Sequence, residues 1–316
     1  MEMADITKEN FSAGIKDKAH ELGFDICGIA KARSLDEYGP HLKTWVEAGM
    51  NDKMGYLARN IEKRLDPENL LPGAKAMVVT GLNYYSENMQ KDPEAPVLSR
   101  YTYGINYHDV ISARLEELFA WIKRQDLKAE GRIIVDSAPL LEKAWAREAG
   151  LGWQGRHSVV INRKIGSFFF IGTLILNIDL AYDAPFKGEY CGDCRLCIEA
   201  CPTRAINNNR TIDARKCIAN LTIENRDPIP LEIIPLLGKR IYGCDKCQEV
   251  CPWNEKARQN KIPEFAINNE VAEMRTEDWM NLSREQFERL FGRSPIGRVN
   301  YEQLMRNIEA AIKSGG

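Results

Sequence analysis

The sequence predicts an α/β (α+β) protein in three parts: an α/β domain at residues 1–184, a cysteine-rich module at residues 185–260 and a C-terminal helical segment at residues 261–316. Three observations lead to this division. Helix and strand patterns alternate along the first part, as is typical of α/β domains. Eight of the nine cysteines then fall between Cys191 and Cys251, in a stretch rich in proline and turn residues. Helical periodicity returns after that stretch.

The elements of the first domain follow from apolar periodicity and from the glycines and turn residues that end each pattern. In chain order we expect a helix over residues 10–23, strands over residues 24–30 and 76–85, a helix over residues 108–125, a strand, turn and helix over residues 131–150, and two strands around a turn over residues 157–176. The cysteine-rich module has too little apolar sequence to form a core, so ligand bonds must hold it together. Residues 282–313 are expected to be helical, and Ser283 with Gln286 matches a capping box.

The composition is that of an ordinary globular protein, with 316 residues, 44% hydrophobic and 28% charged. Its net charge of −2 provides no global attraction for nucleic acid, so a nucleic-acid partner would need a local basic patch. No apolar stretch reaches the ~20 residues of a membrane helix. The first residues also lack the pattern of a secretory signal, a basic region followed by an apolar one. We therefore expect a cytoplasmic protein that makes no membrane contact.

The cysteines occur in two runs of related spacing. The run "CGDCRLCIEACP" begins at Cys191, whereas "CDKCQEVCPWN", which begins at Cys244, lacks the first cysteine of that rhythm. In bacterial ferredoxins such a run gives three cysteines to one iron–sulfur cluster and the fourth, followed by proline, to another. Cys217 is the cysteine left in this window to replace the missing ligand. The pattern predicts a ferredoxin-like module with two [4Fe–4S] clusters, one held by Cys191, Cys194, Cys197 and Cys251 and the other by Cys201, Cys217, Cys244 and Cys247.

Zinc is the alternative, because two zinc sites of four thiolates would use the same eight cysteines. Zinc ribbons, however, usually present separated CxxC pairs without a fourth cysteine and its proline, so the spacing favours iron–sulfur clusters. Cys27 stands apart in an apolar strand, where a free cysteine is commonly a small buried hydrophobe. Clusters carry single electrons and do not select a substrate, so we expect them to supply a site in the first domain.

The first domain contains no glycine-rich dinucleotide motif and no P-loop. Asp136 ends the strand "RIIVD" and has two interpretations. It is a ligand-binding residue if ligands gather at the carboxyl ends of the strands. It is a helix cap if "DSAP" starts a helix, with Pro139 in the first turn. The aromatic stretch "SRYTYGINYHD" over residues 99–109 suits a pocket wall but equally an ordinary loop packed on the sheet.

Several motifs together resemble one family over nearly the whole chain. They include "GYLARN", "SRYTYGINYHD", "VDSAPLLEKAWA", "GLGWQGRHS", "CIANLTIEN" and "FGRSPIGR", along with the two cysteine runs. In order and spacing they resemble the epoxyqueuosine reductases. This resemblance implies reduction of epoxyqueuosine to queuosine at the wobble position of tRNA, the last step of queuosine synthesis. It also implies a cobalamin-binding domain similar to flavin nitroreductase-like folds, with two [4Fe–4S] clusters in the pairing given above.

The resemblance also assigns roles to residues of the first domain. The family's proton donor falls on Asp136, which is also expected to lie beside the corrin. Its pocket-lining pair falls on Tyr107 and His108, which would orient the substrate or relay the second proton. Arg59 matches an arginine expected near the cobalamin, and Ser158 matches a small hydroxyl residue close to the corrin ring.

The implied partners are tRNA with epoxyqueuosine in its anticodon and an external electron donor of flavodoxin or ferredoxin type, with the protein acting as a monomer. Two other functions are alternatives: a reductive dehalogenase-like enzyme with the same cofactors, and a dicluster electron carrier without catalysis. The large first domain disfavours the carrier. Because the net charge is slightly negative, we expect the tRNA surface to consist of local cations, among them Arg204, Arg210, Arg215, Lys216, Arg293 and Arg298.

Overall fold

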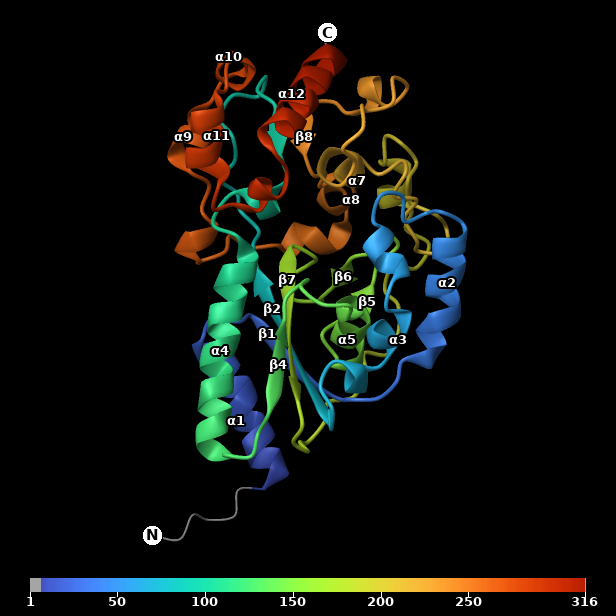
Figure 1. Ribbon diagram of the computed structural model, residues 1–316, viewed down its shortest axis with the longest axis vertical. Coiled ribbons are helices and arrows are strands. Elements are labelled where there is room, and N and C mark those ends of the chain that lie inside the picture. Colours follow the sequence, from blue (N-terminus) through green and yellow to red (C-terminus); the bar gives the residue numbers. More distant parts are fainter. Residues whose placement is uncertain (1–6, 316) are drawn as a thin grey trace.

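The computed structural model describes residues 7–315, which form a sheet between helices with a cysteine-rich segment and a group of helices at one end (Figure 1). In this view α1 and α4 lie on one side of the sheet, and α2, α3 and α5 lie on the other. The mixed α/β architecture is therefore confirmed. The helices are α1 (Lys8–Glu21), α2 (Gly39–Glu47), α3 (Ile61–Leu65), α4 (Tyr107–Gln125), α5 (Glu142–Glu148), α6 (Leu196–Glu199), α7 (Ile218–Ile223), α8 (Lys246–Glu249), α9 (Asn269–Glu273), α10 (Thr276–Met280), α11 (Arg284–Phe291) and α12 (Tyr301–Gly315).

The main sheet has four strands, each antiparallel to its neighbours. In spatial order they are β1 (Ile26–Lys31), β2 (Ala76–Asn83), β7 (Phe169–Leu176) and β4 (Gly131–Ile134). Because the strands alternate in direction, β2 and β4 end where β1 and β7 begin. This end of the sheet faces the cysteine-rich segment, as the bond from Asn83 Nδ2 to the Arg258 carbonyl (2.9 Å) shows. The two smaller sheets pair β3 (Val97–Leu98) with β8 (Arg240–Tyr242), and β5 (Trp153–Gln154) with β6 (Val160–Ile161).

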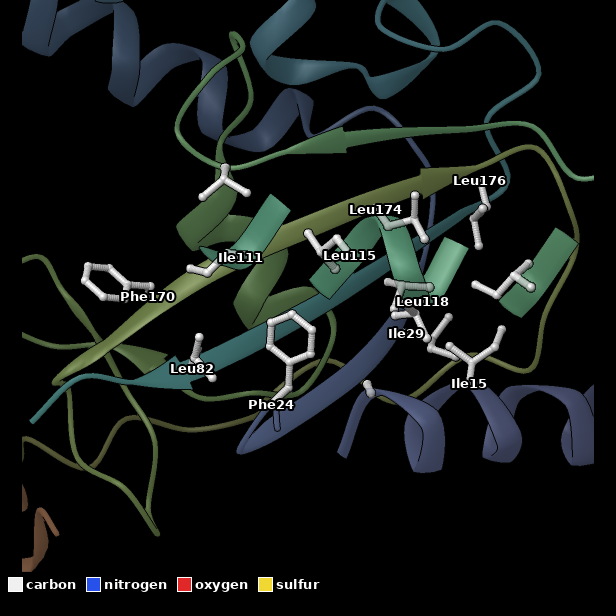
Figure 2. Packing of buried hydrophobic residues seen from close by; sticks show 14 of the residues in the cluster. Ile15, Phe24, Ile29, Leu82, Ile111, Leu115, Leu118, Phe170, Leu174 and Leu176 are labelled. Carbon is white, nitrogen blue, oxygen red and sulfur yellow. The ribbon is translucent and has the colours of Figure 1, made fainter. Parts of the chain in front are cut away.

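The hydrophobic core lies on both faces of this sheet, because successive strand residues point to opposite sides. On one face Leu174 packs with Ile15 of α1 and Leu115 of α4, all fully buried (Figure 2). On the other face its neighbour Ile175 packs with Trp145 of α5. The strand thus reads as a continuous apolar run rather than as an alternating one, which is what a strand covered on both faces requires.

Most elements of the first domain agree with the prediction from periodicity, and Gly23 and Gly150 have the positive φ angles (89° and 76°) of helix stops. The two strands predicted around a turn are present, but they belong to different sheets. Asn162 and Gly166 exchange backbone hydrogen bonds (2.8 and 3.0 Å) across the turn, and the pairing goes no further. Cys27 packs against the core as expected, and burial raises the pKa of its thiol to about 12.

The C-terminal helices share a core with segments from elsewhere in the chain. Trp279 and Phe291 pack with Leu98 of β3 and Tyr242 of β8 in one buried cluster. The capping box of Ser283 and Gln286 is present at the start of α11. The predicted boundaries at residues 184 and 260 stay a prediction. Within residues 7–315, no helix combines the length and the apolar character needed to cross a bilayer.

Candidate active site

A cavity of about 810 Å³ lies where the first domain meets the cysteine-rich segment; we call it the central cavity. Four cysteines line its module side: Cys201, Cys217, Cys244 and Cys247. The first domain contributes residues from α2, α5, β5 and the turn between β5 and β6, among them Trp45, Lys143, Gln154, His157 and Ser158. The central cavity is therefore bounded by both parts of the chain.

A second cavity, of about 350 Å³, is lined by the other four cysteines of the module, Cys191, Cys194, Cys197 and Cys251; we call it the outer cavity. Burial and then the neighbouring Cys251 and Cys191 raise the pKa of the Cys197 thiol to about 11. Each set of four cysteines predicted from the spacing thus lines a cavity of its own. In the part of the chain that the structure describes, no three His, Cys, Asp or Glu side chains gather to hold a single metal ion.

The two cysteine runs fold alike. Each contains a one-turn helix, α6 around Cys197 and α8 around Cys247, and these two helices contact each other. Cys217 comes from a separate segment, where it stands at the N-cap of α7. The side chain of Thr222 in α7 accepts a hydrogen bond from the Gly243 N–H (3.0 Å), directly before Cys244. This bond places the displaced cysteine beside the second run.

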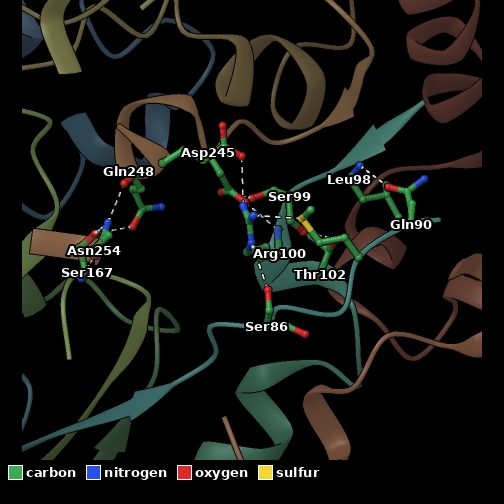
Figure 3. Close-up of polar contacts among 12 residues, drawn as sticks. Ser86, Gln90, Leu98, Ser99, Arg100, Thr102, Ser167, Asp245, Gln248 and Asn254 are labelled. Carbon is green, nitrogen blue, oxygen red and sulfur yellow. Dashed lines mark hydrogen bonds and ion pairs between the residues drawn. The ribbon is translucent and has the colours of Figure 1, made fainter. Parts of the chain in front are cut away.

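Buried polar contacts fix the module on the end of the sheet (Figure 3). The Asp245 carboxylate accepts hydrogen bonds from the Ser99 hydroxyl and from the Arg100 N–H, the latter at 2.8 Å. On the other side Ser167, just before β7, donates to Gln248 Oε1 (2.9 Å) and accepts from Asn254 Nδ2 (2.9 Å). Asp245, Gln248 and Asn254 follow Cys244, Cys247 and Cys251, so these bonds position the cysteines relative to the first domain.

Asp136 lies just beyond the end of β4 in a left-handed conformation (φ 51°). The Tyr107 hydroxyl donates a hydrogen bond to Asp136 Oδ2 at 2.6 Å. The helix-cap interpretation of Asp136 is wrong, because α5 begins only at Glu142 and its N-cap is Leu141. The sheet is also antiparallel, so the rule for carboxyl ends of parallel strands does not explain this position. What holds the aspartate is its contact with the first residue of α4.

The aromatic pair predicted to line the pocket lies at the N-terminus of α4. The Tyr107 ring stacks on Phe170 of β7, with the ring centroids 4.2 Å apart and the planes 6° apart. The His108 ring stacks on Tyr107, and its Nδ1 lies 2.8 Å from Asn106 Oδ1. Burial lowers the pKa of His108. The structure therefore brings Tyr107, His108 and Asp136 together, and the stretch "SRYTYGINYHD" contributes to this site.

Two charged residues of α5 complete the site, although the sequence analysis did not single them out. The Asp136 N–H donates to the buried carboxylate of Glu142, at 3.1 Å to Oε2. Burial, and then the Asp136 charge, raises the pKa of Glu142 well above its ordinary value. Lys143 lines the central cavity together with the four cysteines, and its side chain is exposed. A glutamate in the first turn of a helix is ordinary, so the pattern carried no signal for this role.

The two residues that the resemblance places near the cobalamin lie in different surroundings. Ser158 lines the central cavity, has a left-handed backbone (φ 67°) and accepts a hydrogen bond from Gln154 Nε2 (2.9 Å). Arg59 is exposed at the end of the short 3-10 helix Gly55–Ala58 and lies outside the lining of the central cavity. The structure thus brings Ser158 to the cavity but not Arg59.

The wall of the central cavity carries three buried polar atoms without hydrogen-bond partners among the described residues: Trp153 Nε1, His157 Nε2 and Asn220 Oδ1. His157 Nδ1 accepts a hydrogen bond from the Val159 N–H (3.2 Å), which assigns the ring hydrogen to Nε2. Burial lowers the pKa of His157 to about 4. The groups on Trp153 and His157 are N–H donors, and buried donors are rarely left unpaired in native proteins. His157 also lines the outer cavity.

Two family models match the chain. Residues 190–254 match the 4Fe-4S double cluster binding domain, and residues 64–137 match a model described as epoxyqueuosine reductase QueG. An epoxyqueuosine reductase of Leadbetterella byssophila is 46% identical over 299 residues, which cover 95% of this chain and 97% of the relative. This chain belongs to the epoxyqueuosine reductase family. The family identification from the sequence motifs is thereby confirmed, and with it the enzyme class.

Solved structures agree with this family. The structure of an epoxyqueuosine reductase with an epoxyqueuosine-modified tRNA-Tyr stem loop has a TM-score of 0.89 and 29% identity, covering 96% of this chain and 81% of that one. A Bacillus subtilis epoxyqueuosine reductase, described with an aspartate catalytic loop swung out of the active site, has a TM-score of 0.87 and 27% identity, with the same coverage. A structure described for B12-dependent reductive dehalogenation shares only the fold, with a TM-score of 0.52, 15% identity and coverage of 100% of this chain and 39% of that one.

Proposed function

We propose that this protein reduces epoxyqueuosine to queuosine at the wobble position of tRNA. The observation that carries the proposal is the position of Asp136, which Tyr107 holds beside buried Glu142. The residue after Glu142, Lys143, lines the cavity that four cysteines also line. The name of the Leadbetterella relative and the tRNA stem loop bound to the structural neighbour support it. The likeness to the reductive dehalogenase concerns the fold alone, so it gives no comparable support for a halogenated substrate.

We propose that each cavity-lining set of four cysteines holds one [4Fe–4S] cluster. The donor set fits, because four thiolates surround each space and the match to a double cluster domain spans them all. Burial and the neighbouring Cys244 and Cys217 raise the pKa of Cys247 well above its ordinary value. A thiol in such surroundings gives up its proton when a cationic centre is bound beside it, and the iron of a cluster would be such a centre.

The central cavity is also proposed to hold a cobalamin. Its volume of about 810 Å³ and the unpartnered N–H groups of Trp153 and His157 fit a large ligand with polar edges. Ser158 and Gln154 would bind it on the side of the first domain, and Asp136 would face it from the adjoining site; the exposed Arg59 would reach it only after moving. The fold shared with a B12-dependent reductive dehalogenase supports this assignment. We propose with it the flavin nitroreductase-like fold of the cobalamin-binding domain that the family resemblance implies. When bound, the clusters supply single electrons and the cobalamin supplies a reactive reduced metal, chemistry that belongs to the cofactors.

The side chains of this protein would supply protons and orientation. Converting an epoxide into an alkene and water consumes two electrons and two protons. Asp136 would protonate the epoxide oxygen, with the Tyr107 hydroxyl fixing its orientation. The raised pKa of Glu142 keeps a proton on a buried carboxyl next to Asp136. That proton would pass to Asp136 after Asp136 has given its own proton to the epoxide oxygen. His108 would orient the modified base, which has to leave the anticodon stack to reach this site.

The proposal includes the partners and the setting implied by the family. The substrate is tRNA, an external carrier protein of flavodoxin or ferredoxin type supplies electrons, and the protein works in the cytoplasm as a monomer. The structural neighbour with a bound epoxyqueuosine-modified tRNA stem loop supports the first of these assignments.

The proposed function is tested by incubating anaerobic protein, cobalamin and reductant with tRNA from cells blocked at the epoxide. Mass spectrometry of the nucleosides should show queuosine replacing epoxyqueuosine, and omission of cobalamin should abolish the conversion. Persistence of epoxyqueuosine with protein that contains iron, sulfide and cobalamin would refute the assignment.

A further inference from the structure

A basic surface borders the outer cavity. Five of its cations line a surface groove of about 1120 Å³, and one of them, Lys256, also lines the outer cavity. Arg156 adds a sixth cation on the cavity side. We call these residues the rim patch: Arg156, Arg163, Lys164, Lys256, Arg258 and Lys261.

The rim patch is anchored to the segment that carries the outer cysteines. Arg156 Nη2 donates to the carbonyl of Gly192, between Cys191 and Cys194, at 2.7 Å. The Arg163 guanidinium lies 3.8 Å from the ring centroid of Tyr190, the residue before Cys191. Positive charge is thus held directly at the mouth of the outer cavity.

The cations of the rim patch are not neutralised within the described part of the chain. None of the six forms an ion pair there, and all but the half-buried Arg156 are exposed. By contrast, Arg215 and Lys216 near the central cavity share Asp213. The groove also contains carboxylates, but Glu21 pairs with Lys18 and Asp25 accepts the Asn83 N–H, which leaves Glu255 as the acid facing the patch. In a protein of net charge −2, such a patch is a local feature.

The rim patch lies away from the substrate site. Its groove includes Asp25, just before β1, and Asn83, at the end of β2. Asp136 follows β4, which is the opposite edge of the four-stranded sheet. A macromolecule in the groove would therefore approach the outer cavity from the edge opposite Asp136.

We propose that the rim patch is the docking surface for an acidic one-electron carrier protein that reduces the outer iron–sulfur cluster. This inference rests on the proposed cluster assignment and names the face at which electrons enter. In each encounter the carrier loses one electron and the cluster gains it, with no bond made or broken. The choice of an acidic protein follows from charge complementarity, because opposite potentials raise association rates by ~10–10³-fold and do so less at high salt.

The test compares two charge-reversal variants. The rim variant carries Lys164→Glu, Arg258→Glu and Lys261→Glu, none of which lines the outer cavity. The matched control carries Lys123→Glu and Arg124→Glu in the last turn of α4 and Lys128→Glu just after it, all at exposed positions. Each changes the net charge by the same amount. Stopped-flow absorbance measures cluster reduction by a photoreduced, acidic [2Fe–2S] ferredoxin and by flavodoxin hydroquinone over a range of salt concentrations.

For the rim variant we expect the second-order rate constant at low salt to fall by ~10- to 100-fold and to approach the wild-type value at high salt. The control should stay within about two-fold of wild type. Calorimetry with oxidised ferredoxin should show weaker binding for the rim variant alone. Direct reduction by dithionite should stay within a few-fold of wild type, which verifies that the clusters are intact. A neutral variant, with glutamine at the same three positions, should lower the rate constant at low salt by a smaller factor. It replaces the rim variant in the test if charge reversal prevents folding.

Two results would overturn the proposal. One is a wild-type rate and a wild-type ferredoxin affinity in the rim variant. The other is loss of tRNA affinity with unchanged ferredoxin kinetics, which would make the patch an RNA surface. Wild-type protein without acid-labile sulfide would instead refute the cluster assignment, and calorimetry would still measure docking.

Discussion

At the scale of single residues, the site is built around a backbone conformation that most side chains avoid. Asp136 has a φ of 51°, a region in which aspartate and asparagine are several-fold enriched over other non-glycine residues. Such conformations persist only where the surroundings enforce them. Here the Tyr107 hydroxyl holds the carboxylate and Glu142 accepts the backbone N–H. The conformation aims the carboxyl away from the strand and toward the tyrosine.

Replacing Asp136 with asparagine should separate chemistry from structure. Asparagine tolerates the left-handed conformation, so the Asp136→Asn protein should keep its melting temperature and its iron content. It should lose turnover by ~10²–10⁴-fold, because an amide cannot deliver the proton. Asp136→Ala should in addition lose about 1–2 kcal/mol of stability, since alanine disfavours this φ. Single-turnover assays and thermal melts measure both effects, and an active asparagine variant would exclude the role of proton donor.

Glu142 should make stability depend on pH in a defined direction. Its pKa is raised in the folded protein, so above the ordinary value of 4.5 the unfolded chain has released this proton while the folded chain keeps it. Unfolding then releases a proton, and stability falls as pH rises from 4.5 toward the folded pKa, by up to about 1.4 kcal/mol per pH unit. Glu142→Gln should remove this fall and still accept the Asp136 N–H. Glu117→Gln, at an exposed position, is the control. If stability changes with pH by the same amount in wild type, Glu142→Gln and Glu117→Gln, then Glu142 is ionised in the folded protein.

At the scale of elements, α7 supplies what the second cysteine run lacks. Cys217 stands at its N-cap, and the helix is tied to the segment before Cys244 through Thr222. Cys217→Ala should therefore destroy the cluster of the central cavity and spare that of the outer cavity. Electron paramagnetic resonance of the reduced protein should show one cluster in place of two, with about half of the iron lost. Cys27→Ala, in the core of the first domain, should keep both signals, and two intact signals in the Cys217 variant would contradict the assignment.

The position of α7 depends in turn on α12. Asn307, fully buried in α12, donates to the carbonyls of Thr222 in α7 (2.8 Å) and Ile241 in β8 (2.9 Å). Asn307→Ala leaves both carbonyls without this donor, and unsatisfied buried groups of this kind should cost about 2–3 kcal/mol together. Denaturant titration measures the loss. The exposed Asn281, which bonds to the Glu277 carbonyl of its own helix, is the matched control and should change stability by less than about 0.5 kcal/mol.

At this scale the sequence predicted the features that depend on residues close together in the chain. The apolar period of α4, the apolar run of β7 and the spacing of the cysteines each depend on neighbours in the chain. The antiparallel order of the sheet and the separate pairing of β6 depend on contacts between distant segments, which no single segment specifies. Glu142 and Lys143 were missed for the same reason, because their importance comes from lying beside Asp136 and the cysteines of the central cavity.

At the scale of the whole molecule, the cysteine-rich segment lies between the sheet and the C-terminal helices. It is bonded to the first domain through Asp245 and Asn254, and it shares a buried cluster with Trp279 and Phe291 through Tyr242. The substrate site and the rim patch lie at opposite edges of the sheet. A carrier protein and tRNA should therefore bind without excluding each other.

The tRNA surface is accordingly expected near Asp136, where two of the predicted cations lie. The Arg293 carbonyl accepts the Asn106 N–H (2.8 Å) at the start of α4. Burial raises the pKa of Tyr107, and the positive charge of nearby Arg298 opposes this shift. Of the other cations predicted for this surface, Arg210 is paired with Glu189, and Arg215 and Lys216 are paired with Asp213.

Removing Arg293 and Arg298 should therefore weaken tRNA binding and reduce its dependence on salt. Each phosphate contact in a single-stranded loop contributes about 0.7 to the slope of log affinity against log salt, so the double alanine variant should lose up to about 1.4 from that slope. Arg298 is paired with Glu224, which reduces its contribution to the salt slope. Arg293→Ala alone should therefore produce at least half of the slope reduction expected for the double variant. Binding to an anticodon stem loop measured at several salt concentrations gives the slopes, with the rim variant as the control for lost positive charge. An unchanged slope in the double variant would place the RNA on another face of the protein, and a slope reduced equally in the rim variant would mean that tRNA covers both edges.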